Sequence, residues 1–332
     1  MGWLGDLWKT VRGAEAEDLI FAPNLPMKGL DASKSIVCDG CYVELVVESL
    51  RLERARVFAT KFHGIVYSFV KLSRQGEESA VVAAVSKPPK LAELDPNSIG
   101  KVITVHKSMM GAVPWRGGDL GLELGLFSVK AGNVLTPVVD YVSRVSQIAG
   151  GSFVGAIKPF VPLITEGMDL IAGQSRDTAL EVGIDTTIKL ERPGAFAIIA
   201  AKKGSIDVAR LSIDPADNKL LVAGEPLKAA YCVFSIRAVD RKADYGDIPE
   251  LKASYAAFRA AILKGVEADA KETLAVFRRT AIFSPDLITA DARQLVAAAE
   301  ELMRDAFGGG AISDTGQVRG VPDTLAGLPL YQ

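Results

Sequence analysis

The stretch of residues 120–190 begins with LGLELGL (residues 120–126) and ends with LEVGIDTTIKL (residues 180–190). In both runs apolar side chains occupy alternate positions, and this period of two predicts β-strands with one buried face. After Leu126 the apolar positions shift by one residue, so we expect a β-bulge there. Gly125 and Gly183 leave room on the opposite face for a neighbouring backbone or helix. We therefore predict two similar core strands that bracket a helical insertion.

Two helices are predicted between these strands, in an insertion at residues 134–173. Thr136 and Pro137 match an N-cap followed by proline in the first helical turn, and apolar residues then recur with helical spacing. A second, shorter helix is expected at residues 162–172. The segment at residues 147–163 is apolar and rich in glycine and proline. It is interpreted either as a buried connection between the helices or as a membrane-active stretch.

Most of the chain up to residue 240 has the pattern of β-strands. Asp39-Gly40 is a favoured two-residue hairpin turn, which predicts that Cys38 pairs with Cys41. A second hairpin is expected where residues 208–213 and 219–223 flank a cluster of turn formers, and the apolar run at residues 230–239 suits an inner strand. Further strands are expected at residues 55–61, 65–72, 80–85, 101–107 and 195–201. Residues 34–240 are thus predicted to form an antiparallel β-sandwich.

From Pro249 onward the apolar residues recur with a helical period, which predicts three helices in residues 248–308. Thr289 is expected to cap the third helix, and Gly308 follows its last turn. The tail at residues 309–332 is rich in glycine and proline and is either mobile or docked as an extended segment. The predicted fold class is α+β: an antiparallel β-sandwich with a two-helix insertion and a C-terminal helical bundle.

Composition limits the classes of function. The 332 residues carry 38 basic and 40 acidic side chains, and these are interspersed, so no basic patch for nucleic acid is expected. Cys38, Cys41 and Cys232 are too few for a disulfide framework in a chain of this size. No apolar run approaches the roughly 18 residues that span a bilayer, and the first residues lack the pattern of a secretory signal. We expect a cytoplasmic protein, or one peripheral at a membrane.

A short amphipathic helix is predicted at residues 1–12. Its apolar side chains Trp3, Leu4, Leu7 and Trp8 recur at intervals of three and four, so they share one face. Such a helix can pack on its own domain, dock on a partner protein or lie in a membrane surface. This face is the candidate partner or membrane surface.

No motif of a known catalytic mechanism stands out. The G-x-S-x-G elbow, H-E-x-x-H and the phosphate-binding G-x-x-x-x-G-K-[ST] loop are absent from the sequence. Cys38 and Cys41 have the C-x-x-C spacing of half a zinc site, but the expected hairpin turn already explains that spacing. The two histidines, His63 and His106, are interpreted as structural residues.

Acidic loops are the remaining candidates for a metal site. Asp240, Asp244 and Asp247 follow the expected inner strand, and Asp214 and Asp217 lie at a hairpin tip. If two such loops converged, their carboxylate oxygens could hold calcium. Polar turns and helix caps account for the same residues. We therefore expect no cofactor. If an ion does bind, calcium and zinc are the two candidates.

The leading hypothesis is a non-enzymatic cytoplasmic binding or scaffold protein, a subunit of a multi-protein assembly whose partner is another protein and not nucleic acid. One alternative is a peripheral membrane-binding or membrane-active protein that uses the tryptophan helix or residues 147–163. The other is a metal-dependent enzyme with a carboxylate site.

Overall fold

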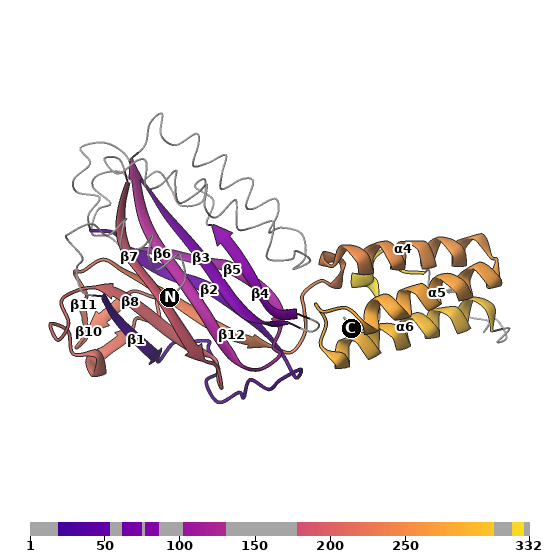
Figure 1. Ribbon diagram of the computed structural model, residues 1–332, viewed down its shortest axis with the longest axis horizontal. Coiled ribbons are helices and arrows are strands. Elements are labelled where there is room, and N and C mark those ends of the chain that lie inside the picture. Colours follow the sequence, from indigo (N-terminus) through magenta and orange to yellow (C-terminus); the bar gives the residue numbers. More distant parts are fainter. Residues whose placement is uncertain are drawn as a thin grey trace.

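The computed structural model describes residues 19–53, 62–74, 77–85, 102–130, 178–308 and 321–328. Within these residues the fold belongs to the α+β class, as predicted, with three antiparallel sheets and three α-helices (Figure 1). The strands of the sheets precede the helices along the chain. The three helices extend beyond the end of β12 (Tyr231–Val239).

The larger sheet has five strands in the order β1-β8-β12-β2-β5. The other four strands are Leu19–Leu25 (β1), Tyr42–Arg51 (β2), Val102–Pro114 (β5) and Gly194–Ala200 (β8). The prediction of an inner strand at residues 230–239 is confirmed, because β12 pairs with β8 on one side and with β2 on the other. Both faces of β12 are buried there: Cys232 and Phe234 join one hydrophobic cluster, while Tyr231 and Val233 join another.

The second sheet has four strands in the order β4-β3-β6-β7. Their bounds are Phe62–Arg74 (β3), Glu77–Val85 (β4), Asp119–Lys130 (β6) and Thr178–Lys189 (β7). The two similar stretches of sequence lie in β6 and β7 and pair with each other, so that Gly125 is opposite Gly183. The register shifts between Leu126 and Phe127, which confirms the expected bulge.

One hydrophobic core receives side chains from both of these sheets. Alternate residues of β6 enter it because successive side chains of a strand point to opposite faces. Its members include Leu120, Leu122, Leu124 and Leu126 from β6, and Val43, Leu45, Val47, Phe234 and Ile236 from β2 and β12. Full burial of a leucine contributes about 2 kcal/mol, so this alternation is a strong constraint on register.

A small sheet lies against the other face of the five-stranded sheet. It consists of β9 (Leu211–Ile213), β10 (Leu220–Val222) and β11 (Glu225–Pro226). The expected second hairpin is confirmed, since β9 and β10 pair antiparallel. Leu220 packs in one cluster with Tyr231 and Val233 of β12, and its amide donates to the Tyr231 hydroxyl at 3.1 Å.

The prediction of a hairpin around Asp39-Gly40 is wrong. The turn itself forms, with Asp39 at a positive φ of 56° and the Gly40 amide donating to the Val37 carbonyl. However, β2 pairs with β12 and β5, and residues 36–38 belong to no strand. Both edges of β2 are occupied by strands distant in sequence, so the local partner has no edge to pair with.

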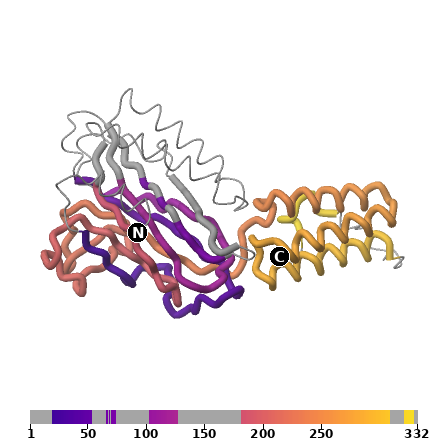
Figure 2. Tube along the Cα trace, viewed as in Figure 1, coloured from indigo at the N-terminus to yellow at the C-terminus, as the bar shows by residue number. Residues whose placement is uncertain are grey.

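Three helices follow the sheets: α4 (Pro249–Lys264), α5 (Glu267–Ile282) and α6 (Thr289–Phe307). Figure 2 follows the chain from β12 into these helices. The predicted apolar faces are buried in one cluster that includes Leu251, Tyr255, Phe258, Phe277 and Leu295. Gly265, at a φ of +73°, ends α4 in the left-handed conformation that glycine adopts at little cost.

The prediction that Thr289 caps α6 is wrong. Thr289 is the first residue of the helix, the capping position is Ile288, and no side chain of that position makes a capping bond. The Thr289 amide instead donates to Oδ1 of Asp39 at 3.0 Å, from a turn that lies 250 positions earlier. A carboxylate from the sheet region therefore fills the capping role.

Part of the C-terminal tail is docked. Residues 321–328 contain a short 3₁₀ helix, η6 (Leu325–Gly327), and Leu325 and Leu328 are buried among the side chains of the three helices. Of the two alternatives considered for the tail, docking holds for this segment, but its 3₁₀ helix shows that it is not extended throughout.

Several predictions lie outside the described residues. These are the helix at residues 1–12 with Trp3, Leu4, Leu7 and Trp8, the strand at residues 55–61 and the insertion at residues 134–173 with its apolar stretch 147–163. Among the helices that are described, none has the length and hydrophobicity needed to cross a membrane.

Candidate functional site

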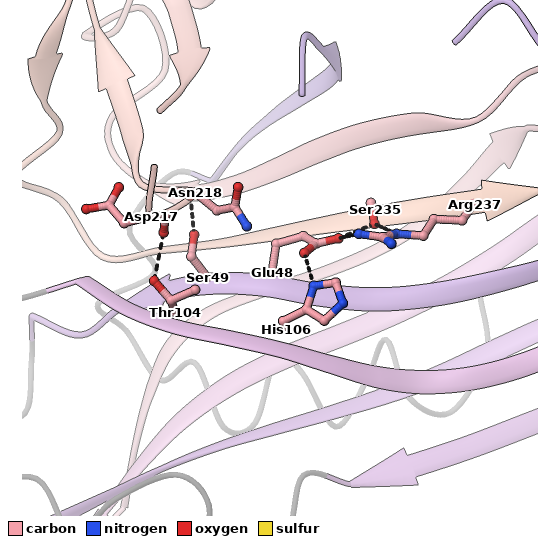
Figure 3. Close-up of polar contacts among 8 residues, drawn as sticks. All are labelled: Glu48, Ser49, Thr104, His106, Asp217, Asn218, Ser235 and Arg237. Carbon is pink, nitrogen blue, oxygen red and sulfur yellow. Dashed lines mark hydrogen bonds and ion pairs between the residues drawn. The ribbon is translucent and has the colours of Figure 1, made fainter. Parts of the chain in front are cut away.

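Four polar side chains on three neighbouring strands form the candidate site, the Glu48 cluster. It consists of Glu48 on β2, His106 on β5, and Ser235 and Arg237 on β12 (Figure 3). The register between β2 and β12 shifts so that Glu48 is an extra residue between Val47 and Ser49. The register between β2 and β5 shifts at the same place. Bulges re-aim side chains, and this one brings charged residues together.

Glu48 is fully buried, and all its close polar neighbours are donors. Its Oε1 accepts from the Ser235 hydroxyl at 2.5 Å and from Arg237 Nη2 at 2.7 Å. Its Oε2 lies 2.9 Å from His106 Nδ1. A carboxylate only accepts, so Nδ1 is the protonated ring nitrogen in this pairing. The buried charge is thereby paired, which is the condition for its being tolerated.

His106 is the accessible member of the cluster. Its side chain is 61% exposed, and its backbone has a positive φ of 41°, a conformation uncommon for residues other than glycine. With Nδ1 turned toward Glu48, the other ring nitrogen is the one available to solvent or to a ligand. A carboxylate that orients an imidazole in this way also occurs behind metal-binding histidines.

The bonds within the cluster differ from those of a hydrolase triad. In a triad the imidazole lies between the nucleophile and the carboxylate. Here Ser235 donates directly to Glu48, and Arg237 Nε donates to the same hydroxyl at 3.2 Å. The serine is therefore held by groups that stabilise the fold, and no base is placed to activate it. The interpretation of His106 as a structural residue agrees with this geometry.

The negative charge of the acidic hairpin tip next to the cluster is partly neutralised by a lysine of the same hairpin. Lys219 Nζ lies 3.0 Å from Asp214 and 3.2 Å from Asp217. Hydrogen bonding from the Ala216 amide and from Lys219 lowers the pKa of the Asp214 carboxyl. Backbone carbonyls of the tip accept hydrogen bonds from Ser49 and Thr104, which fix the tip to the sheet (Figure 3).

The three aspartates predicted as a metal site are not brought together, and two of them have separate partners. Asp240 pairs with Lys34 at 2.6 Å, and Asp244 accepts from the Gly246 amide and so caps η5 (Tyr245–Asp247). Asp247 is exposed at the end of the same short helix. Within the described ranges, no three His, Cys, Asp or Glu side chains come close enough to one another to hold a metal ion.

All three cysteines are free thiols. Cys38 is exposed, while the buried Cys41 donates to the Val37 carbonyl at a sulfur distance of 3.8 Å. Burial raises the pKa of the Cys41 thiol, and complete burial raises the pKa of Cys232 to about 12. Buried thiols of this kind are protonated at neutral pH and behave as small apolar side chains.

A second polar cluster, the junction cluster, joins the five-stranded sheet to the helices. Tyr42 of β2 donates to Asp291 of α6 at 2.7 Å, and Tyr245 donates to the same carboxylate. The Tyr42 hydroxyl also accepts from the Ile288 amide at 3.2 Å. Burial raises the pKa of Tyr42, and hydrogen bonding to Asp291 adds to that effect, so the hydroxyl stays a donor.

Two cations complete the junction cluster. Lys242 donates to the Ala112 carbonyl of β5 and lies 5.4 Å from the centre of the Tyr42 ring. Burial lowers the pKa of Lys242, and nearby acids, first Asp286, oppose that shift. Arg116 pairs with Asp39 and also donates to the Leu287 carbonyl. This cluster could not be predicted from the sequence, because Tyr42 and Asp291 are separated by 249 positions.

Exposed apolar side chains gather on the helices. Seven large hydrophobic residues are exposed among those described, and five belong to the helical segment: Leu263, Val266, Val276, Ile282 and Phe283. Phe283, at the end of α5, is the most exposed of them at 74%. Val276 lies in α5, and Phe283 directly follows the last residue of that helix, with the exposed Arg279 between them along the chain.

The described residues thus contain two polar clusters and a group of exposed apolar side chains near the C-terminal end of α5. The buried polar side chains of the two clusters hydrogen-bond to one another or to the backbone. These bonds hold the strands, the hairpin tip and the helices in place. Comparisons of the chain with protein-family models, with curated proteins and with solved structures find no match.

Proposed function

We propose that this chain is a non-enzymatic binding or scaffold protein of the cytoplasm that joins a multi-protein assembly through its helices. The single observation that carries the proposal is a group of exposed apolar side chains in the last two turns of α5 and directly after it, Val276, Ile282 and Phe283, here called the α5 face. An apolar side chain held in water at the end of a helix costs free energy that a partner can recover by covering it. Helix faces of this kind are common docking surfaces.

The proposed architecture supports this role. We infer that the two large sheets pack face to face as an antiparallel β-sandwich, because both contribute side chains to one core. We also infer that α4, α5 and α6 form a C-terminal bundle around their own core. The junction cluster then holds the bundle on the sandwich, so that the α5 face is presented in a fixed orientation.

The chemistry of the Glu48 cluster also favours binding over catalysis. Glu48 accepts hydrogen bonds from the Ser235 hydroxyl at 2.5 Å and from Arg237 at 2.7 Å. The His106 imidazole is the exposed group of the cluster. A general base needs a partner atom within hydrogen-bond reach of a reacting group, and here the serine hydrogen already belongs to Glu48.

Site-specific photo-crosslinking in the native cell tests the proposal. A photoreactive amino acid replaces Phe283, and in a matched control it replaces Lys271, an exposed polar residue of the same helix. We expect a discrete crosslinked product from position 283 and none from position 271. The substitution Val276→Asp should abolish that product, because a charge on the same helix face opposes docking.

Two results would refute the proposed function. One is the absence of any crosslinked product from position 283 in cells where the protein is folded and abundant. The other is an identical set of products from both positions, since random encounters do not depend on the apolar face. Mass spectrometry of a specific product would name the partner.

A further inference from the structure

The docked tail segment, residues 321–328, occupies a site on the helices. It lies beside η5, and its Leu325 and Leu328 are 2% and 0% exposed within the helical core. Twelve residues, 309–320, separate it along the chain from the end of α6. The segment is thus bound to the helices as a separate peptide would be, through side chains of its own.

Two polar side chains of α4 and two leucines of the segment make the contact. The Tyr255 hydroxyl donates to the Pro322 carbonyl at 3.0 Å, and Arg259, one helical turn further along α4, pairs with Asp323. Leu325 and Leu328 are three positions apart, a spacing that places side chains on the same side of a 3₁₀ helix. The site therefore selects a carboxylate followed by two leucines at fixed spacing.

The segment also folds on itself. The Gly327 amide donates to the Thr324 carbonyl, and the Leu328 amide donates to the Leu325 carbonyl. A Cβ atom on residue 327 would lie 2.7 Å from Cβ of Pro322, closer than such atoms approach. Glycine is needed at this position because the ring of Pro322 packs against it.

The internal ligand does not use the whole site. Arg259 holds Asp323 through Nη2, while its Nε is buried and makes no hydrogen bond. A guanidinium can bind a carboxylate through two parallel hydrogen bonds, and these are stronger than one. A ligand whose carboxylate also reached Nε would form a second hydrogen bond that Asp323 does not make.

We propose that α4 and η5 form a recognition site for a segment of a partner protein with the pattern Pro-Asp/Glu-x-Leu-x-Gly-Leu. Residues 321–328 occupy that site as an internal ligand, which the partner segment displaces. A segment of the same chain competes with any free ligand, so the site responds only to a strong or locally abundant partner. This inference does not rest on the exposed face of α5, which is a different surface.

Peptide binding to the full-length protein tests the proposal. The probe is a fluorescent synthetic peptide of residues 321–328, and binding is followed by fluorescence anisotropy. Two variants empty the site: Leu325→Asp with Leu328→Asp removes the apolar anchors, and Gly327→Ala places a methyl group against Pro322. Gly111→Ala is the matched control, because a Cβ there meets no atom within 4 Å.

We expect the peptide to bind both emptied variants at least tenfold more tightly than the wild type or Gly111→Ala. A peptide with aspartate in place of both leucines should not bind. Hydrogen exchange of residues 321–328 should rise in the emptied variants. The proposal is overturned if the peptide fails to bind Gly327→Ala that still melts cooperatively, or if it binds all four proteins equally. It is also overturned if the aspartate peptide binds as well as the leucine peptide.

Discussion

Removal of the Asp39 carboxylate should destabilise α6, although Asp39 lies far from that helix in the sequence. In the folded protein Asp39 accepts the Thr289 amide at 3.0 Å and pairs with Arg116. Loss of a helix cap costs about 1 kcal/mol. Loss of the charged hydrogen bond to Arg116 costs about 1 kcal/mol more after allowance for its partial exposure. We therefore expect Asp39→Ala to lower the free energy of unfolding by about 2 kcal/mol.

The assay is urea unfolding followed by circular dichroism at 222 nm, which reports the helices. With a denaturant slope of about 1–3 kcal/mol per molar, the unfolding midpoint should fall by about 0.7–2 M. The unfolding midpoint of Asp39→Asn should fall by roughly half as much. The amide carbonyl of asparagine can still accept the Thr289 amide, but it carries no charge to pair with Arg116. Asp31→Ala is the control, since the Asp31 carboxylate bonds to near neighbours in its own exposed turn, and the unfolding midpoint of this variant should not move.

The same contribution should depend on pH. Burial by itself would raise the pKa of the Asp39 carboxyl, but hydrogen bonds from Thr289 and the charge of Arg116 outweigh burial and lower that pKa. A lowered pKa means that the stabilisation is complete above the unfolded value of about 3.9 and is lost as the pH falls through the folded value. The difference between wild type and Asp39→Ala should therefore shrink in acid. The reasoning fails if Asp39→Ala matches Asp31→Ala, or if the difference is the same at pH 7 and pH 2.

Three further predictions follow from other parts of the chain. Glu48→Ala should lower the free energy of unfolding by about 2–3 kcal/mol, measured by urea unfolding, because Arg237 and Ser235 lose their shared acceptor; Glu48→Gln should cost less, and equal effects would contradict the pairing. If the tryptophan helix binds membranes, deletion of residues 1–12 should abolish co-sedimentation with liposomes, and unchanged binding would exclude that role. If the carboxylate site binds metal, protein purified without chelators should contain a metal that is lost in the triple variant Asp240→Ala, Asp244→Ala, Asp247→Ala; metal analysis that finds none in either protein would exclude it.

The alternation of apolar residues was enough to predict the strands near residues 120–126 and 180–184 and the bulge at Leu126. These features depend on which face of a strand is buried. Because successive side chains point to opposite faces, the positions of the apolar residues indicate the buried face. The same holds for the inner strand β12, whose two faces are both apolar, and for the faces of α4 and α6. Local spacing carries this information because a residue and its neighbours share one regular backbone.

The two errors, at Asp39 and Thr289, have a single physical cause. An Asp-Gly pair favours a tight turn, but whether the flanking residues pair depends on which strands occupy the edges of β2, and here β12 and β5 occupy both. A threonine before a helical run can cap the helix, but the cap came from Asp39 across 250 positions. In both cases a local preference was correct as a tendency and was overruled by a contact between distant residues.

The sequence by itself determined the α+β class, the faces of the strands and helices, and the positions of most turns. Only the tertiary structure decided which polar residues meet: Glu48 with His106 and Arg237, Tyr42 with Asp291, and Arg259 with Asp323. Burial of apolar groups is non-directional and is recorded in the pattern of a single segment. Hydrogen bonds and ion pairs are directional and need two specific atoms within about 3 Å, so they can be assigned only when both segments have been placed.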